Sequence, residues 1–475
     1  MAGLGKRRPA RMRSGVSGLQ GRQVPPASPR VAGDGPVTIE RLAHDGRGVA
    51  HTAAGKTLFV DGALPGERLE VAVHRARKRF DEGHVRELVT PSPERVTPPC
   101  AHFGRCGGCD LQHLALDAQR HHKVAVLLEL LARQGIEPPL APQLLAGAGE
   151  GYRRRARLGI KVDAEGGVHL GFRARHSHRL VDIADCTILV PSLNALLTPL
   201  HALVASLEAP RQAGHLELLE SDQGVVLVLR QLREHDADRG RWLAFAERHG
   251  LHLARLLGRE TPRLEWLTPA PALSCRVPGP GEALTLGFAP GDFLQANAKI
   301  NRQLIQTALA WLGNVEGLAL LDLFAGVGNF SLPLAAAGAR VTAVEGSPAM
   351  VERLAGNARR NDLEVYTRQA DLGRAGVVAE LLASGPPEVV VLDPPRDGAA
   401  AVCRTLVEHP VPRLLYVSCD PATLARDAAR LVHGGYRPSR IAVADMFAHT
   451  SHLESMLLFE HPRTGRQPLG VTPDG

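Results

Sequence analysis

Several features that would set this chain apart from ordinary globular proteins are missing from it. It has no apolar run of the roughly 18 residues that a membrane-spanning helix requires. Its first residues lack the apolar segment of a secretory signal. Seven cysteines among 475 residues, an odd number, do not suit a secreted disulfide scaffold. These absences favour a cytoplasmic protein with reduced cysteines and no membrane partner.

Acidic residues are absent from residues 1–33, which carry seven lysines and arginines. The rest of the chain holds 49 basic and 49 acidic side chains, so the net charge of +7 comes from this Gly-, Pro- and Ser-rich segment. Such a composition predicts a disordered basic tail. The tail could add attraction to phosphates or act only as a solubilising extension, and the missing amphipathic pattern disfavours a transit peptide.

Short apolar strands separated by glycine turns occupy residues 34–91. About five strands in so few residues predict an OB-like β-barrel, a shape that often binds oligonucleotides. The stretch HRARKRF, residues 74–80, adds four cations and an aromatic ring at the far edge of this domain. Its context favours a nucleic-acid contact over a merely solvated strand face.

Residues 92–285 are predicted to form a mixed α/β central domain. The stretch GYRRRARLGIKVD, which begins at Gly151, reads as a strand with unusually many arginines. Alternation along a strand places Arg153, Arg155 and Arg157 on one face. A one-sided row of arginines is a candidate surface for phosphate contacts.

Regular alternation of strand-like and helical stretches runs from residue 286 to 460, and residues 461–475 follow as a C-terminal tail. Helical connections of this length are those that parallel strands need. Seven strand-like segments predict a doubly wound, Rossmann-like α/β sheet. Ligands of such sheets bind at the carboxyl ends of the strands, so motifs at those ends are the informative ones.

The first of these strands ends in a glycine loop, DLFAGVGNF, residues 322–330. The third glycine of a dinucleotide fingerprint is missing, since Ser331 stands in its place. Glu345 ends the second strand, where an acid commonly binds ribose hydroxyls, and Asp371 after the third could bond an adenine amine. Although each acid alone could be a turn residue, the set favours S-adenosylmethionine over NAD.

The fourth strand ends in DPPRDG, in which Asp393 can accept a hydrogen bond from a ring N–H. Enzymes that methylate exocyclic amines often carry an aromatic residue where this motif has Arg396. Methylation of a carbon then becomes the alternative, and it needs another means of activating the target.

A thiol and a base supply that activation for C5 of uracil. A thiolate that adds to C6 converts the ring to an enolate, C5 then attacks the methyl donor, and a base removes the C5 proton. Cys419 lies in the SCDP turn after the fifth strand, and Glu454 lies in HLES just before the last strand. The alternatives are a buried filler thiol and a solvated glutamate, but their joint placement favours catalysis. The target base must leave its stack to reach them.

A second group of cysteines lies in the central domain. Cys100, Cys106 and Cys109 have the spacing C-x5-C-x2-C, and Cys186 lies apart from them. Four thiolates could hold zinc or an iron–sulfur cluster, and their spacing leaves this choice open. A radical enzyme would need a tighter spacing, so that use is not expected.

Taken together, these motifs resemble the RNA uracil-5-methyltransferase family from about residue 36 to 460. The resemblance implies that Cys419 is the nucleophile and Glu454 the base. It also implies that the four cysteines of the central domain bind a [4Fe-4S] cluster and that the barrel is a TRAM domain. The cofactor and base pocket would be lined by Gln295, Phe324, Asn329, Glu345 and Asp393.

A TRAM domain combined with a cluster resembles the branch of the family that acts on 23S ribosomal RNA. The expected function is therefore methylation of C5 in a flipped uridine of 23S rRNA by a monomer. A tRNA methyltransferase and a non-catalytic RNA-binding assembly factor are the alternatives. The turn SCDP replaces the commoner SCNP, which places the Asp420 carboxylate where it is expected to oppose thiolate formation.

Overall fold

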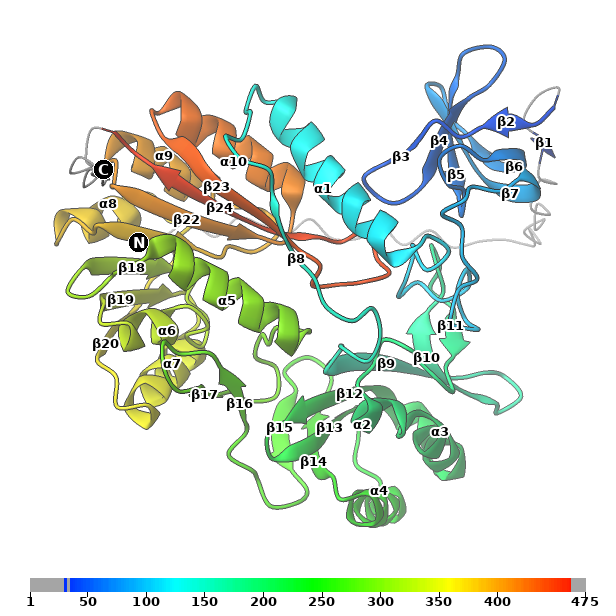
Figure 1. Cartoon of the computed structure of the whole chain (residues 1–475). Helices are drawn as coiled ribbons and strands as arrows, with labels where there is room; N and C mark the ends of the chain where they lie inside the picture. The colour runs from blue at the N-terminus through cyan, green and yellow to red at the C-terminus, as the bar shows by residue number, and fades with distance from the viewer. Residues whose placement is uncertain (1–29, 32–34, 463–475) are drawn as a thin grey trace, which may run out of the picture.

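The computed structural model describes residues 30–31 and 35–462, which form three large sheets and a two-stranded one (Figure 1). The predicted basic tail, residues 1–33, lies outside the described residues except for β1 (Arg30–Val31), which pairs with β6. The predicted C-terminal tail begins too early. His461 is buried, with its ring 4.9 Å from that of Tyr436.

The N-terminal sheet has seven strands where about five were expected. Its order is β1-β6-β7-β5-β4-β3, with β2 also paired to β6. Its side chains Ile39, Leu58, Val60 and Leu69 form a small core of their own. Residues 77–79, in the turn between the two long strands, are exposed as the HRARKRF stretch suggested. The strands are β2 (Val37–Thr38), β3 (Arg41–Leu42), β4 (Gly48–His51), β5 (Thr57–Asp61), β6 (Arg68–Ala76) and β7 (Phe80–Thr90).

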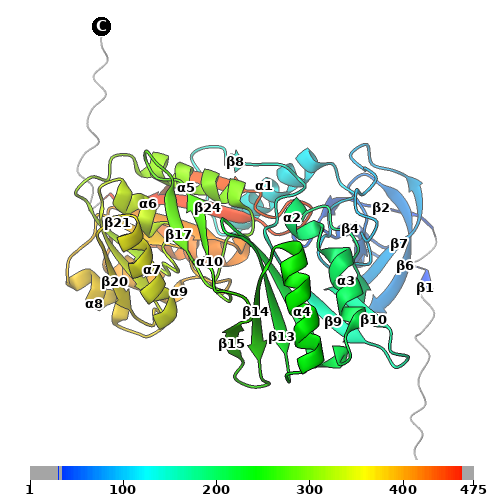
Figure 2. The same cartoon turned by 90° about the horizontal axis from the view of Figure 1, so that it is seen from below.

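The central sheet has the order β11-β10-β9-β12-β13-β14-β15. Helices α3 and α4 lie side by side on one face (Figure 2), and Leu200 and Trp242 bury their side chains in the core there. The elements are β9 (Arg155–Val162), β10 (Val168–Arg173), β11 (Leu180–Asp182), α2 (Pro191–Asn194), α3 (Leu197–Ser206), η1 (Pro210–Gln212), β12 (Ala213–Ser221), β13 (Gly224–Gln231), α4 (Asp236–His249), β14 (His252–Leu257) and β15 (Arg263–Trp266). A separate hairpin, β16 (Ser274–Val277) with β17 (Leu284–Gly287), follows.

The predicted row of arginines on the central sheet is largely engaged inside the protein. Arg155 forms an ion pair with Glu217 on the neighbouring strand and also bonds the Asp292 carbonyl. The Nε–H of Arg153 donates to the Arg155 carbonyl at 3.0 Å. Arg157 is exposed, whereas Arg153 and Arg155 are half-buried, so contacts within the protein engage two of the three side chains predicted to meet phosphates.

The C-terminal sheet has eight strands in the order β20-β19-β18-β21-β22-β24-β23-β8, and β24 runs antiparallel to both of its neighbours. Val389 and Val391 of β21 face one hydrophobic core, whereas Val390 and Leu392 face the other. This alternation explains why helices cover both faces, as the doubly wound prediction requires. The strands are β8 (Gln143–Leu145), β18 (Ala319–Leu323), β19 (Arg340–Glu345), β20 (Val365–Gln369), β21 (Val389–Leu392), β22 (Arg413–Ser418), β23 (Arg437–Ala444) and β24 (Glu454–Glu460).

Two elements from the region predicted as the central domain join this C-terminal layer instead. Strand β8 pairs in parallel with β23 and forms the sheet edge. Helix α1 lies beside α10 (Figure 1), with Leu127 and Leu131 in the same core as that helix. The division at 92–285 therefore cuts through a packed unit, because apolar pattern alone does not say which core a helix joins. The helices are α1 (Leu116–Ala132), α5 (Ala298–Leu312), α6 (Ser331–Ala336), α7 (Pro348–Arg360), α8 (Val377–Ala383), α9 (Ala400–Glu408) and α10 (Pro421–His433).

A buried ion pair fixes α1 to the loop after β23. The Lys123 ammonium lies 2.7 Å from one oxygen of Asp445, and both side chains are almost fully buried. Arg120 reaches the other oxygen at 3.2 Å. Burial lowers the pKa of Lys123, which the nearby Asp445 carboxylate opposes. Within the described part of the chain, no helix is long and apolar enough to cross a membrane.

Replacing the acid of this pair should destabilise the protein strongly. Asp445→Ala leaves a buried ammonium without its counter-ion, so we expect the free energy of unfolding to fall by about 3 kcal/mol, measured by urea denaturation. Asp117→Ala is the matched control. Its carboxylate also pairs with Arg120, at 3.0 Å, but is 85% exposed. That variant should lose less than about 0.5 kcal/mol. Equal losses in the two variants would contradict this account.

Candidate active site

Three strand ends bring the predicted thiol and carboxyl groups to one edge of the C-terminal sheet. Asp393 follows β21 and Cys419 follows β22, two parallel neighbours whose carboxyl ends meet at the same edge. Glu454 is the first residue of β24, and the antiparallel register pairs Ser455 with Ser418. The start of β24 therefore lies where β22 ends. Residues 393, 419 and 454, which are far apart in the sequence, become neighbours in this way.

The two carboxyl groups at this edge are held in a protein environment that favours their neutral forms. Asp393 is partly exposed, yet burial of its carboxyl raises the pKa to about 7, and the nearby Asp322 carboxylate adds to the rise. Glu454 is 3% exposed, and burial followed by repulsion from Asp393 raises its pKa well above the ordinary value. The Arg396 guanidinium lowers it. Both carboxyl groups therefore keep their protons to a higher pH than free carboxyl groups do.

The Cys419 thiol is half-buried beside the same two carboxyl groups. Burial raises its pKa to about 11, and Glu454 and Asp393 contribute further. The Arg396 cation and the backbone N–H of Cys419 act in the opposite direction. The thiol thus lies at a loop opening beside two carboxyl groups and is not sealed in the core.

Asp420 does not act on the thiol in the way that the sequence suggested. Its carboxylate caps helix α10 and accepts a hydrogen bond from the Thr423 backbone N–H at 2.8 Å. The Asp420 backbone N–H donates to the Ser418 hydroxyl at 3.2 Å. The carboxylate is thus engaged at the helix N-terminus, and the acids that raise the pKa of Cys419 are Glu454 and Asp393.

The glycine loop after β18 is closely tied to the acid at the end of β19. One oxygen of Glu345 accepts from the Gly326 N–H at 3.1 Å, and the other accepts from the Ser347 N–H at 2.8 Å. Phe324 has φ of 65°, a left-handed conformation that is rare for a bulky residue and is found mostly at functional sites. The loop thus holds the Glu345 carboxylate at the sheet edge.

The remaining predicted cofactor residues differ in their surroundings. The amides of Asn329 and Asn301 exchange two hydrogen bonds, of 2.9 and 3.0 Å. Gln295 is 7% exposed, and its carbonyl accepts from the Arg154 guanidinium at 2.8 Å. Asp371 is exposed and accepts from the Gly373 N–H at 2.9 Å, as a turn residue does.

Sequence reasoning assigned no role to Asp322, the first residue of the glycine-loop motif. It is 1% exposed and accepts from the Ser331 hydroxyl at 2.5 Å. Burial raises its pKa to about 7, and its charge in turn acts on Asp393. An acid inside an otherwise apolar strand was the available signal, since acids are almost never fully buried without a partner.

The four predicted ligand cysteines converge, although they come from separate segments. Cys100, Cys106, Cys109 and Cys186 all line one cavity of about 90 Å³. Burial raises the pKa of Cys109 to about 12 and that of Cys186 to about 11, and the thiols repel one another's negative forms. Among the described residues, no three His, Cys, Asp or Glu side chains are arranged to hold a metal ion. The four thiols are gathered at this one cavity.

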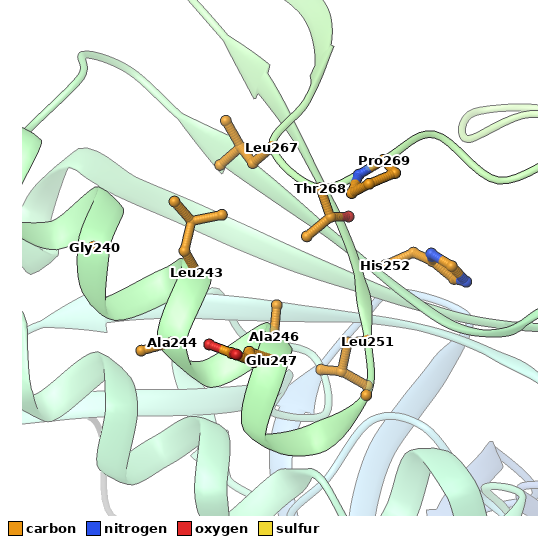
Figure 3. A pocket seen from close by; sticks show the side chains of 11 residues that line it. Gly240, Leu243, Ala244, Ala246, Glu247, Leu251, His252, Leu267, Thr268 and Pro269 are labelled. Atoms are coloured by element: carbon orange, nitrogen blue, oxygen red, sulfur yellow. The ribbon is translucent and has the colours of Figure 1, made fainter.

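A larger cavity, of about 680 Å³, lies elsewhere, between α4 and residues 267–269 of the central domain (Figure 3). Leu243, Leu251 and Leu267 are among its lining side chains. None of the predicted site residues lines it. This cavity is therefore separate from the residues gathered at the edge of the C-terminal sheet.

Known proteins match this arrangement along the whole chain. The tRNA (uracil-5-)-methyltransferase family model matches residues 116–367 and 381–462, and the TRAM domain model matches residues 36–85. The 23S rRNA (uracil(1939)-C(5))-methyltransferase RlmD of Halomonas elongata is 64% identical over 100% of both chains. The protein of the same name from Chromohalobacter salexigens is 57% identical over 96% of this chain and 95% of its own.

A solved structure shows the same fold. The tRNA (uracil-54, C5)-methyltransferase of Pyrococcus abyssi, in complex with S-adenosyl-L-homocysteine, has a TM-score of 0.68 and 23% sequence identity. The match covers 89% of this chain and 100% of that one.

The raised pKa of Asp393 predicts a pH-dependent gain in stability for Asp393→Asn. Because the pKa is about 7 in the folded chain against an ordinary 3.8, folding favours the protonated carboxyl. That contribution is complete below about pH 4 and is lost as the pH rises through about 7. Asparagine does not titrate, so the unfolding temperature of the variant relative to the original chain should rise between about pH 5 and about pH 8. An unchanged difference would contradict the shift.

Proposed function

The chain belongs to the tRNA (uracil-5-)-methyltransferase family, and we propose that it methylates C5 of a uridine in 23S rRNA. The observation that carries this proposal is the 64% identity, over the full length of both chains, to an enzyme named for uracil 1939 of 23S rRNA. The TRAM match over residues 36–85 supports an RNA substrate. The corresponding uridine is the proposed target. The reaction takes place in the cytoplasm, where ribosomal RNA is made.

The chemistry follows from the residues at the sheet edge. S-adenosylmethionine would supply the methyl group and leave as S-adenosylhomocysteine. The Cys419 thiolate adds to C6 of uracil, which makes C5 electron-rich enough to take that methyl. Glu454 then removes the C5 proton, the bond between C6 and sulfur breaks, and the ring double bond re-forms with release of the thiolate. The raised pKa of Glu454 supports its role as the base, since tuned acids and bases gather at active sites. The Arg396 cation favours the Cys419 thiolate by opposing the rise in the pKa of this thiol.

The remaining roles are assigned by position. Asp393, between Asp322 and Glu454, faces the uracil ring and bonds its N–H. Glu345 is suited to ribose hydroxyls, because the loop amides of Gly326 and Ser347 already orient its carboxylate. Phe324, Asn329, Gln295 and Asp371 complete the cofactor and base pocket. All of these groups come from one chain, so a monomer suffices.

The four cysteines are proposed to bind a [4Fe-4S] cluster. What supports this proposal is that all four cysteines line one small cavity, which Phe103 and Phe172 also line. The proposed reaction transfers no electrons, so the cluster's role is to hold its surroundings together. The cysteines do this by joining residues 100–109 to the distant segment that carries Cys186.

Replacing the two catalytic residues separates the halves of the reaction. Cys419→Ala should lower methyl transfer to a 23S rRNA fragment by at least ~1,000-fold while S-adenosylmethionine still binds, because the activating thiolate is gone. Glu454→Gln should instead trap the RNA–protein adduct, seen as a band that resists denaturant on a gel. Radiolabelled methyl transfer and calorimetry measure these effects.

Cys403→Ala serves as the control, since this thiol is fully buried in the core away from the site. It should retain activity. Full activity in Cys419→Ala would refute the role of Cys419 as the nucleophile. Methylation of tRNA in preference to the 23S fragment by the original chain would favour the alternative substrate.

A further inference from the structure

The loop that carries the chain into Glu454 is held in a conformation that it does not maintain by itself. This loop, residues 445–453, connects β23 to β24. At its centre His449 has φ of 66°, a left-handed conformation that is strained for a residue other than glycine. Such a conformation persists only where surrounding contacts impose it.

Those contacts come largely from the loop of the cysteines, residues 100–111. The backbone N–H groups of Asp110 and Leu111 both donate to the His449 carbonyl at 3.0 Å. The Asp110 carboxylate accepts from the Ser451 N–H at 2.7 Å and from its hydroxyl at 2.8 Å. Asp110 directly follows Cys109, and Ser451 lies three residues before Glu454. Four residues, Asp110, Ser451, His452 and Leu453, thus lie between a proposed cluster ligand and the proposed base along this path.

Gln119 and Tyr152 also hold this loop, besides Lys123 and Arg120, which pair with Asp445 at its start. Gln119 of α1 accepts from the His449 N–H at 2.9 Å and donates to the Leu111 carbonyl at 3.0 Å, so it joins both loops. The Tyr152 hydroxyl donates to the Ala448 carbonyl at 2.9 Å. Tyr152 is also bonded through its backbone N–H to Ile188, two residues after Cys186. The segment with Cys109 therefore bonds the loop 445–453 directly. The segment with Cys186 is connected to the same loop through Tyr152.

The nucleophile is supported differently. The turn of Cys419 is organised by the Ser418 hydroxyl and by the Asp420 cap on α10. Neither contact involves the cysteine loop. The Ser455 hydroxyl, next to Glu454, also donates to the Ser418 carbonyl at 3.3 Å, so the base and this turn share one contact. A disturbance of residues 100–111 should therefore reach the base before it reaches the thiol.

We propose that Asp110 is a positioning residue, which holds Glu454 in register for proton removal by linking Ser451 to the cysteine loop. This inference rests on the proposed function. A base displaced by about 1 Å can lose roughly 100-fold in rate. Loss of the contact slows the second half of the reaction, so C5 is methylated but keeps its proton and C6 stays bonded to sulfur.

The test compares two substitutions of Asp110 in the full chain, with a 23S rRNA fragment and S-adenosylmethionine. Asp110→Ala removes both contacts, and we expect denaturant-resistant adduct to accumulate while turnover falls by about 10- to 100-fold. Asp110→Asn should restore release, because its carbonyl oxygen accepts from the Ser451 N–H and its amide donates to the Ser451 hydroxyl oxygen. Adduct formation in a single turnover should stay within a few-fold of the original chain.

Three controls make the result specific. Asp238→Ala is matched, since this carboxylate also holds a loop, accepting from the N–H groups of Glu208 and Ala209 at 2.8 and 2.9 Å, but in the central domain. It should cause no adduct. Ser451→Ala, outside the cysteine loop, should accumulate adduct to a smaller extent. The visible iron–sulfur absorption should be unchanged in Ser451→Ala, so that positioning is separated from cluster loss.

Glu454→Gln, run on the same gel, distinguishes a failure of the proposed function from a failure of the positioning role of Asp110. No adduct with Glu454→Gln would overturn the proposed function itself. Adduct with Glu454→Gln but none with either Asp110→Ala or Ser451→Ala would overturn only the positioning role. Adduct formation that slows in parallel with turnover in both variants would likewise mean that the contact is merely structural.

Discussion

The direction of one strand is the constraint on which this site depends. Because β24 runs antiparallel between β22 and β23, its first residue lies at the edge where the parallel strands end. Had it run parallel, Glu454 would lie about seven residues, or over 20 Å, from Cys419 along the sheet. The loop 445–453 makes the reversal of chain direction between β23 and β24. This explains why so many buried contacts hold that loop.

The same edge of the sheet holds three acidic side chains at positions where burial disfavours their charged forms. Asp322, Asp393 and Glu454 all have raised pKa values, and Arg396 is the cation that moderates the last. Stability alone does not require three acids there, since buried unpaired charges are costly. Proton transfer does require groups whose pKa values lie near the working pH. The free energy lost by burying these three acids is consistent with a catalytic use for them.

Much of the fold and of the candidate site could be predicted from the sequence, because motifs at the carboxyl ends of parallel strands must meet at one edge of the sheet. The family, the S-adenosylmethionine-type α/β sheet and the TRAM region are confirmed. The placement of α1 and β8 was not predictable, since an amphipathic helix or a three-residue strand carries no mark of the core that it joins. The arginines of β9 misled for a related reason: Glu217 and the Asp292 carbonyl, far away in sequence, engage Arg155. Asp420 caps α10, and this role could be recognised only once the first residue of that helix was known. The [4Fe-4S] cluster and the individual site roles stay predictions.

The central claim is that sulfur of Cys419 bonds transiently to C6 of the target uracil. An RNA fragment with 5-fluorouridine at the target position tests this directly, because fluorine cannot be removed from C5 as a proton can. The account predicts that the unaltered protein, given S-adenosylmethionine, stops as a stable adduct whose mass includes the RNA and one methyl group. Peptide mass spectrometry should place the nucleotide on Cys419. No adduct, or attachment to a different residue, would contradict the claim.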